Sequence, residues 1–492
     1  MTLRIPFDNS YARLPERFYA RMPPSPAAAP ALIRVNTALA EELGIDPAAL
    51  ASPEGIAVLA GNRVAEGSEP LAQAYAGHQF GGFSPQLGDG RALLLGEVIG
   101  RHGRRDIALK GSGPTPFSRR GDGRAALGPV MREYVVSEAM AALGLPTSRA
   151  LAAVLTGETV RRERPLPGAI FTRVAASHLR IGTFQYFAAG GDTEALRLLA
   201  DYAIDRHYPA AKEAASPYRA LLEAVTRAQA ELIARWLHIG FIHGVMNTDN
   251  MTISGETIDF GPCAFMDGYD SRRVLSSIDH HGRYAYGNQP NIGFWNLTRL
   301  AETLLPLLDA NEESAIAVAK EALEPYVPTF QTAYDAGLCR KIGLSPSPEN
   351  TEVAHALLTL MGAHEADFTL TFRKLADAVP GAEGEAVFRA LFTAADAPPP
   401  DDWLARWRQR LASETESPEA RQAAMRATNP AVIPRNHIME RVIAAAVDSQ
   451  NFKPFEAFLE VLSQPYSDQP EYADYALPPK PEERVLQTFC GT

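Results

Sequence analysis

Cysteine is scarce in this chain of 492 residues, which has three, at Cys263, Cys339 and Cys490. A secreted protein stabilised by a disulfide framework needs more of them, so the cysteine content predicts a cytoplasmic protein. The sequence also lacks an uninterrupted apolar run of about 18 residues, the length that spans a bilayer. Its N-terminus has neither the basic start nor the apolar stretch of a signal peptide. The sequence therefore predicts neither export nor a membrane span.

Basic residues do not outnumber acidic ones in this chain. The chain has 47 Lys and Arg against 58 Asp and Glu, which gives a net charge of -11. Nonspecific affinity for nucleic acid comes mainly from neutralising phosphates, so this charge argues against a general nucleic-acid binder. With 46% hydrophobic residues, the chain can form a large core divided into two or three subdomains.

Four segments follow one another along the chain. Residues 1–70 combine proline-rich loops with a short helix near 36–43, and predict an N-terminal extension packed on the next domain. Residues 71–180 predict a small lobe with strands at 91–99, 106–110, 150–155 and 169–174 and a helix at 129–143. Residues 181–310 predict a second lobe that includes a helix ending near Gly240, and residues 311–492 predict a helical C-terminal region with a cysteine-bearing tail.

Three chemical signals occur in the order that protein kinases use. Lys110 ends a predicted strand, a His-Gly loop follows at residues 243–250, and Asp-Phe-Gly stands at 259–261. The order predicts an α+β, protein-kinase-like fold with two lobes. Val245 stands where a kinase loop has its catalytic aspartate, and its side chain cannot accept a proton. The chain is therefore expected to hold a metal nucleotide without using it as a kinase does.

Asn250 and Asp259 are the predicted metal ligands. Their side-chain oxygens suit a hard cation such as Mg²⁺, and a hairpin over residues 251–258 would bring them together. Asp-Phe-Gly alone is common by chance, and gains specificity from the preceding loop. Asp249 has two interpretations that the residues leave open. The first is a structural role, in which Asp249 caps the loop or supports the metal ligands. The second is a catalytic role, in which Asp249 is the general base that replaces the carboxylate missing at Val245.

Glycine and arginine residues near Lys110 predict an anion site. The turn at residues 88–91 contains Gly88, Gly90 and Arg91, and glycines let backbone amides approach phosphates. The loop at 111–124 follows Lys110 directly and contains three arginines, at 119, 120 and 124. An ordinary hairpin turn and a flexible surface loop are the alternative interpretations.

Several charged side chains are assigned to the same predicted cleft. Lys110 would be a solvated surface residue unless a carboxylate holds it, and Glu133 on the 129–143 helix is the predicted partner, with Glu138 as the alternative. Arg173 and Arg180 either reach the cleft or form structural ion pairs.

Longer motifs resemble those of the selenoprotein-O-like protein adenylyltransferases, the bacterial YdiU-type proteins. The similar stretches are residues 6–15, 75–83, 88–91, 110–123, 247–251 and 258–266, and the resemblance covers nearly the whole chain. It implies a kinase-like fold in which ATP lies reversed, so that AMP passes to a Ser, Thr or Tyr hydroxyl of a protein and pyrophosphate leaves. Transfer of UMP from UTP is a further implied possibility.

The resemblance also implies roles for individual residues. Asp249 would accept the proton, and Asn250 and Asp259 would hold Mg²⁺ or Mn²⁺. The nucleotide would be bound by Gly88, Gly90, Arg91, Lys110, Asp122, Gly123, Arg173, Arg180 and Asp259. Lys110 and the arginines would stabilise the negative charge of the departing pyrophosphate.

Some eukaryotic members of this family carry selenocysteine near the C-terminus, whereas this chain has an ordinary cysteine, Cys490. That excludes a selenium-dependent role. Cys263 lies two residues after Asp-Phe-Gly, so a Cys263–Cys490 bridge could control the nucleotide cleft. Two unpaired thiols are the alternative.

Two other functions compete with nucleotidyl transfer. One is transfer of the γ-phosphate to a protein or a small molecule, against which Val245 argues. The other is a catalytically dead scaffold that binds a nucleotide. The presence of both predicted metal ligands argues against that interpretation.

Overall fold

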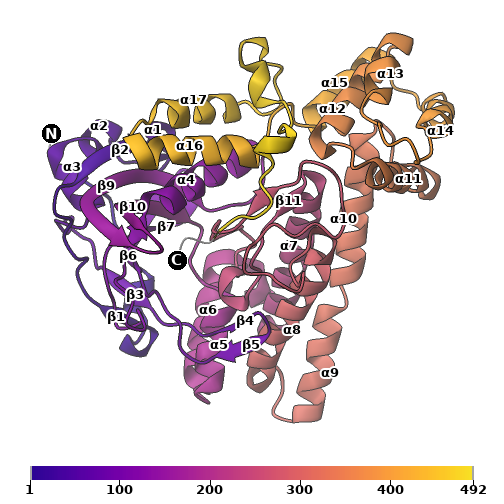
Figure 1. Ribbon diagram of the computed structural model, residues 1–492. Helices are drawn as coiled ribbons and strands as arrows, with labels where there is room; N and C mark the ends of the chain where they lie inside the picture. Colours follow the sequence, from indigo (N-terminus) through magenta and orange to yellow (C-terminus); the bar gives the residue numbers. More distant parts are fainter. Residues whose placement is uncertain (1–2, 490–492) are drawn as a thin grey trace.

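The computed structural model describes residues 3–489, and its mixture of helices and strands confirms the α+β class (Figure 1). Its main sheet has eight strands in the order β1-β3-β6-β7-β10-β9-β2, with β8 paired to β10. The pairings are antiparallel. The strands are β1 Tyr19–Arg21, β2 Ala31–Val35, β3 Leu71–Gln73, β6 Ala92–Gly100, β7 Gly103–Lys110, β8 Ala125–Ala126, β9 Arg149–Arg161 and β10 Pro165–Ala175.

The N-terminal segment supplies both outer strands of this sheet. β1 and β2 belong to residues 1–70, and they pair with β3 and β9, which lie in the predicted small lobe. The segment also forms the short helices α1 Thr37–Glu42, α2 Pro47–Leu50 and α3 Pro53–Leu59. Asn36 caps α1 by accepting a hydrogen bond from the Leu39 amide, a local stabilisation typical of Asn at this position. The predicted extension is thus part of the sheet as well as packed against it.

The strands and the helix predicted around Lys110 are confirmed. β6 and β7 form a hairpin in which Ala92 lies opposite Lys110, the last residue of β7. Helix α4, Leu127–Ala142, begins two residues before the predicted start and packs on β9 and β10. Its buried residues include Met131, Tyr134 and Val135. β9 and β10 are both longer than predicted.

Helices dominate the predicted second lobe, to the right of the sheet in Figure 1. Helix α7 buries Leu221, Val225, Leu232 and Trp236 on one face, as their spacing predicts. The predicted hairpin at 251–258 closes with a single antiparallel bridge, between Met251 and Thr257, and forms no longer ladder. The helices here are α5 Ile181–Ala189, α6 Thr193–His207, α7 Pro217–His238, α8 Gln289–Leu308, α9 Glu312–Leu323 and α10 Tyr326–Lys341, and the short strand pairs are β4 Gly77–Gln79 with β5 Gly82–Ser84 and β11 Phe241–Ile242 with β12 Ala264–Phe265.

The C-terminal region is helical, as predicted, but it divides between two places. Helices α11 to α15 share a core with α10 that contains Trp403 and Trp407, whereas α16 and α17 return to pack on α4 (Figure 1). After α17, Thr488 reaches back and donates its hydroxyl to the carbonyl of Pro262 at 2.5 Å. The helices are α11 Pro348–His364, α12 Phe368–Ala378, α13 Ala382–Arg389, α14 Asp401–Leu411, α15 Pro418–Thr428, α16 Asn436–Ser449 and α17 Lys453–Leu462.

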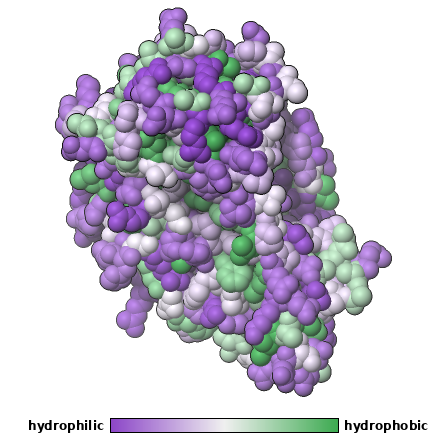
Figure 2. Space-filling model, turned by 90° about the vertical axis from the view of Figure 1, so that its right-hand side faces the viewer, coloured by the Kyte–Doolittle hydropathy of each residue, from purple (hydrophilic) through white to green (hydrophobic). Residues whose placement is uncertain are grey.

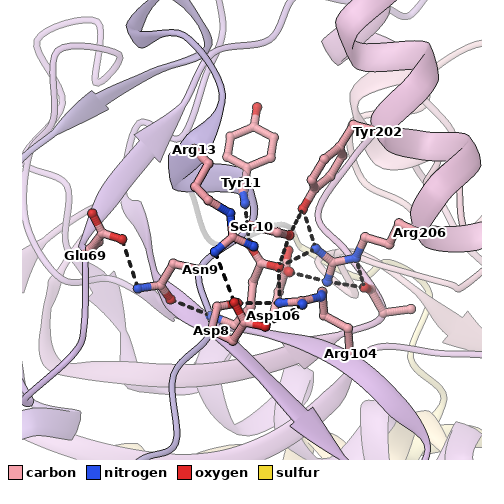
Figure 3. Close-up of polar contacts among 12 residues, drawn as sticks. Asp8, Asn9, Ser10, Tyr11, Arg13, Glu69, Arg104, Asp106, Tyr202 and Arg206 are labelled. Atoms are coloured by element: carbon pink, nitrogen blue, oxygen red, sulfur yellow. Dashed lines mark hydrogen bonds and ion pairs between the residues drawn. The ribbon is translucent and has the colours of Figure 1, made fainter.

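A buried cluster of charges anchors the N-terminal segment to the sheet and to helix α6 (Figure 3). Glu97 of β6 accepts hydrogen bonds from the Ser10 hydroxyl at 2.5 Å and from the Tyr11 amide at 2.6 Å. Arg206 of α6 lies 3.0 Å from Glu97 and 2.5 Å from Asp106 of β7. Buried carboxylates are stable when a cation and hydrogen-bond donors accompany them. This cluster therefore joins residues 10–11, the sheet and α6 at one point.

No helix within residues 3–489 is long and apolar enough to cross a membrane. The face drawn in Figure 2 is mostly hydrophilic, with hydrophobic residues in small groups.

Candidate active site

A cleft of about 480 Å³ is lined by residues from the sheet, from the 111–124 loop and from the 243–261 segment. Every residue predicted for catalysis, nucleotide binding or metal binding lines it, and so does Val245. The predicted residues found there are Gly88, Gly90, Arg91, Lys110, Asp122, Gly123, Arg173, Arg180, Asp249, Asn250 and Asp259.

Lys110 has carboxylate partners on two sides. Its ammonium nitrogen lies 2.6 Å from Oε2 of Glu133 on α4 and 3.1 Å from Oδ1 of Asp259. The alternative partner, Glu138, instead binds Arg149 through both carboxylate oxygens. The structure thus places Glu133 beside Lys110, and the lysine is held inside the cleft.

Asp259 is the most strongly paired carboxylate of the cleft. Its Oδ1 lies 2.6 Å from Arg173 in addition to Lys110, and its Oδ2 lies 3.5 Å from Arg180. Burial acts to raise the pKa of Asp259, but Arg173, Lys110 and Arg180 together hold it well below its usual value. Its backbone has a φ of 63°, a left-handed conformation that is uncommon outside glycine. The ionised carboxylate is therefore held at a fixed place in the cleft.

Arg173 both reaches the cleft and forms ion pairs, so its two interpretations are compatible. Its guanidinium contacts Asp259, and its Nε donates to Nε2 of His178 at 3.2 Å. That contact requires a lone pair on Nε2, so the proton of the neutral imidazole is on Nδ1, which lies 2.9 Å from Asp106 Oδ2. Burial lowers the pKa of His178, which favours the neutral ring. Sequence analysis missed His178, because only the fold brings it beside Arg173.

The glycines at 88 and 90 are required by a close approach of two loops. A Cβ on Gly88 would lie 2.3 Å from the Phe117 ring, and one on Gly90 would lie 2.9 Å from the Phe117 carbonyl oxygen. The Thr115 hydroxyl also donates to the Asp89 carbonyl at 2.7 Å. The 88–91 turn and the 111–124 loop therefore form one wall of the cleft.

The charges of the 111–124 loop are only partly neutralised within the protein. Arg124 pairs with Glu158 at 2.9 Å, and Asp122 pairs with Arg162 at 2.8 Å. Arg162, another residue of the cleft wall, was missed by sequence analysis. Arg119 and its neighbour Arg120 form no ion pair with any residue from 3 to 489. They leave positive charge available to an anionic ligand.

Asp249 lies at the helical side of the cleft, where one of its oxygens has no partner. Oδ2 accepts a hydrogen bond from Gln79 at 3.2 Å, whereas the buried Oδ1 has no hydrogen-bond partner among residues 3–489. Burial raises the pKa of Asp249 to about 6. A Cβ on Gly77 would lie 2.5 Å from Oδ1, so only glycine leaves room for the carboxylate in this position. An unpaired buried carboxylate oxygen in a cleft is suited to accept a proton from a ligand.

The β4–β5 hairpin holds the loop that carries Asp249. The amide of His78 donates to the Thr248 hydroxyl at 2.7 Å, and the amide of Phe80 donates to the Asn247 side chain at 3.1 Å. With the Gln79 contact, three consecutive hairpin residues bind three consecutive loop residues. Gly77, Gly81 and Gly82 are a sequence signal for the hairpin, but no sequence signal indicates that the hairpin binds the 247–249 loop.

The oxygen ligands of the cleft fit a cation that is shared with a nucleotide. Residues 3–489 contain no group of three or more His, Cys, Asp or Glu side chains that could hold a metal ion. Asn250 donates its amide to the Val245 carbonyl at 3.0 Å, which leaves its side-chain oxygen available in the cleft that Asp259 also lines. Mg²⁺ is commonly bound by one or two carboxylates, with phosphates and water completing its coordination. This donor set suits that arrangement.

A model of the family described as "Protein adenylyltransferase SelO" matches residues 1–463. The chain belongs to the SelO family. It is 62% identical to the protein nucleotidyltransferase YdiU of a strain of Methylorubrum extorquens, with both chains covered completely. It is 63% identical to the YdiU of Rhizobium johnstonii, over 99% of this chain and 97% of the relative. The predicted SelO-type resemblance is therefore confirmed.

The predicted cysteine pair of this SelO member is only partly within the described residues. Cys263 is buried, with its sulfur 3.5 Å from the Phe260 carbonyl oxygen, and Cys490 lies outside residues 3–489. Thr488 contacts Pro262, the residue before Cys263. The pairing of the two cysteines stays a prediction.

Proposed function

We propose that this protein nucleotidyltransferase moves AMP from ATP to Ser, Thr or Tyr hydroxyls of other proteins, in a cleft between the two lobes of a protein-kinase-like fold. The observation that carries the proposal is Asp249, which lines the same cleft as Lys110 and Asp259 and whose buried Oδ1 has no hydrogen-bond partner among residues 3–489. Val245 occupies the kinase position of the catalytic base and is a buried apolar residue, so Asp249 is the carboxylate available for that role.

Each step has a candidate group in the cleft. The acceptor hydroxyl gives its proton to Asp249 Oδ1, and its oxygen forms a bond to the α-phosphorus of ATP. The bond from the α-phosphorus to the oxygen that bridges to the β-phosphate breaks, and pyrophosphate leaves with the bonding electrons. Lys110, Arg173 and Arg180 supply positive charge where that leaving group develops negative charge.

Asn250 and Asp259 would hold Mg²⁺ or Mn²⁺ in this proposal. When bound, such a cation would neutralise phosphate charge and orient the nucleotide. The arginines that contact Asp259 keep its carboxylate ionised, which is the form that binds a cation. The scarcity of cysteine supports a cytoplasmic location for the reaction.

Labelled nucleotides test the reaction directly. The full chain is incubated with lysate proteins, Mg²⁺ or Mn²⁺, and ATP labelled on either the α- or the γ-phosphate. Labelling of protein from the α-position alone supports the proposal, and UTP labelled on the α-phosphate tests UMP transfer in parallel. Labelling from the γ-position alone would assign a kinase, and labelling from neither would assign a nucleotide-binding scaffold.

Two variants sharpen the result. Asp249→Ala should lower AMP transfer by about 10²- to 10⁴-fold, the usual contribution of a general base. Val245→Asp restores the carboxylate of a kinase loop, and with reversed ATP it should not create γ-phosphate transfer. Gain of γ-label transfer in Val245→Asp, with little effect of Asp249→Ala, would refute the mechanism.

A further inference from the structure

Two exposed apolar side chains mark a rim of the cleft. Phe80, at the turn of the β4–β5 hairpin, and Ile278 both line the cleft, and each is 41% exposed. Among the described residues that line the cleft, no other large apolar side chain is as exposed as these two. The groups around Lys110 that would bind phosphates are charged. The cleft wall thus combines the charged groups around Lys110 with two exposed apolar side chains.

Phe80 is held at this rim in spite of an unfavourable backbone conformation. Its φ is 51°, and a bulky residue in the left-handed region is uncommon. Its amide donates to Asn247, and its ring packs at 5.3 Å from the ring of Tyr284. The preceding residue, Gln79, contacts Asp249 itself. Strained residues concentrate at functional sites, and here the strain places an exposed ring in a fixed relation to Asp249.

A cation without a carboxylate partner lies beside the same turn. A Cβ on Gly81 would be 3.8 Å from the Arg283 guanidinium, which stacks 4.7 Å over the Trp295 ring. Arg283 forms no ion pair within residues 3–489, and its buried Nε has no hydrogen-bond partner there. The nearby carboxylate of Asp279 accepts the backbone amides of Arg283 and Tyr284 and forms no ion pair with the Arg283 side chain among the described residues. We call Phe80 and Ile278, which line the cleft, together with Arg283 beside the hairpin turn, the acceptor rim.

We propose that the acceptor rim docks a polypeptide segment in which an apolar side chain and an acidic side chain flank the acceptor hydroxyl. This inference rests on the proposed function, because a protein hydroxyl that reaches Asp249 must bring its neighbouring residues to the mouth of the cleft. Exposed aromatic residues and arginine dominate the energetics of protein interfaces. The unpaired guanidinium of Arg283 complements a carboxylate on the substrate. The rim thus selects which hydroxyls of a protein surface are modified.

A peptide library tests the selection. Peptides with a fixed central Ser, Thr or Tyr and random flanking positions are incubated with the full chain and α-labelled ATP, and the labelled peptides are sequenced. Enrichment of apolar and acidic residues at defined flanking positions is expected. Equal labelling of all flanking sequences, or labelling of lysate proteins but of no peptide, would overturn the proposal. Failure to label lysate proteins and peptides alike would instead refute the proposed function.

A charge reversal tests Arg283 more sharply. Two peptides are compared that differ only in Glu or Lys at the enriched acidic position. The wild type should prefer the Glu peptide by about tenfold or more in kcat/KM, which corresponds to about 1.4 kcal/mol. Arg283→Glu should reverse the preference, and Arg283→Gln should abolish it. An unchanged preference in Arg283→Glu, or a tenfold weaker dissociation constant for ATP in that variant, would assign Arg283 elsewhere and overturn its role.

Phe80 is tested by a substitution that suits its backbone. Phe80→Gly removes the ring, and glycine adopts the left-handed φ of this position without strain, so the hairpin should remain folded. The KM for the preferred peptide should rise about tenfold or more, while the dissociation constant for ATP stays within about threefold. Ile99→Ser is the matched control, since Ile99 is 61% exposed on β6 and does not line the cleft. Equal peptide KM values in the wild type and Phe80→Gly would overturn the proposal. Self-association that Phe80→Gly abolishes, without any peptide preference, would assign the rim to a second copy of the chain and overturn it as well.

Discussion

Adding one methyl group at Gly77 should displace the proposed base without unfolding the protein. Gly77 has no positive φ, so its backbone accepts alanine. The new Cβ would, however, lie 2.5 Å from Asp249 Oδ1 and 3.0 Å from the Leu87 side chain, whereas ordinary contacts begin at 3.4 Å. The carboxylate must therefore move by about 0.9 Å if the backbone stays in place.

This displacement predicts a loss of rate rather than a loss of ATP binding. A misplacement of about 1 Å at a reacting group can cost about 10²-fold. We expect kcat for AMP transfer in Gly77→Ala to fall by that order, with the KM for ATP nearly unchanged. Initial rates with α-labelled ATP measure both constants. A thermal melting curve should shift by only a few degrees, because alanine also restricts the unfolded chain, by about 0.4–1 kcal/mol.

A control lies on the same hairpin. A Cβ on Gly82 would meet its nearest neighbour, the Gln79 carbonyl oxygen, at an ordinary 3.5 Å, so Gly82→Ala should keep wild-type activity. Adding Gly77→Ala to Asp249→Ala should cause no further loss, since both changes act on one carboxylate. Wild-type kcat in Gly77→Ala would refute the assignment of Asp249 as the base. Equal losses in the two glycine variants would show that the hairpin, and not the carboxylate, is the sensitive part.

Three other predictions concern Lys341, His178 and the predicted cysteine pair. Burial lowers the pKa of Lys341 to about 7, so between pH 7 and its unfolded value of about 10.4 the unfolded chain binds more protons and stability rises with pH. From pH 7 to 9, the free energy of unfolding should therefore rise by about 2 kcal/mol more in the wild type than in Lys341→Met. Denaturant unfolding at each pH measures this free energy, and an equal rise in the two proteins would contradict the prediction. The side chain of His178→Gln can still accept a hydrogen bond from Arg173, whereas that of His178→Asn is too short to do so. The kcat/KM for ATP should therefore fall about tenfold further in the Asn variant than in the Gln variant. Equal values in the two variants would refute the positioning of Arg173 by His178. If Cys263 and Cys490 pair, a reductant should change AMP transfer in the wild type but not in Cys490→Ser, and identical responses would exclude the bridge.

Local sequence patterns were enough to predict the strands and helices near Lys110 and the chemical groups that they carry. Lys110 at the end of a strand and Glu133 on the next helix were predictable, because strand alternation, proline and glycine signals act over a few residues. The choice of Asn250 and Asp259 as candidate metal ligands followed from the chemistry of their oxygens. Long motifs also identified the family, since a shared pattern over nearly the whole chain is far more specific than a tripeptide.

Contacts between residues far apart in the chain could be found only from the three-dimensional fold. Gln79 binds Asp249 across 170 positions, and His178 reaches Asp106 across 72, with no periodicity in the sequence to indicate either contact. The strands that complete both edges of the sheet come from residues 1–70, since strand pairing depends on the whole sheet rather than on local preference. The unpaired oxygen of Asp249 is likewise a property of packing, because burial and the absence of a partner arise only when the hairpin closes over the loop.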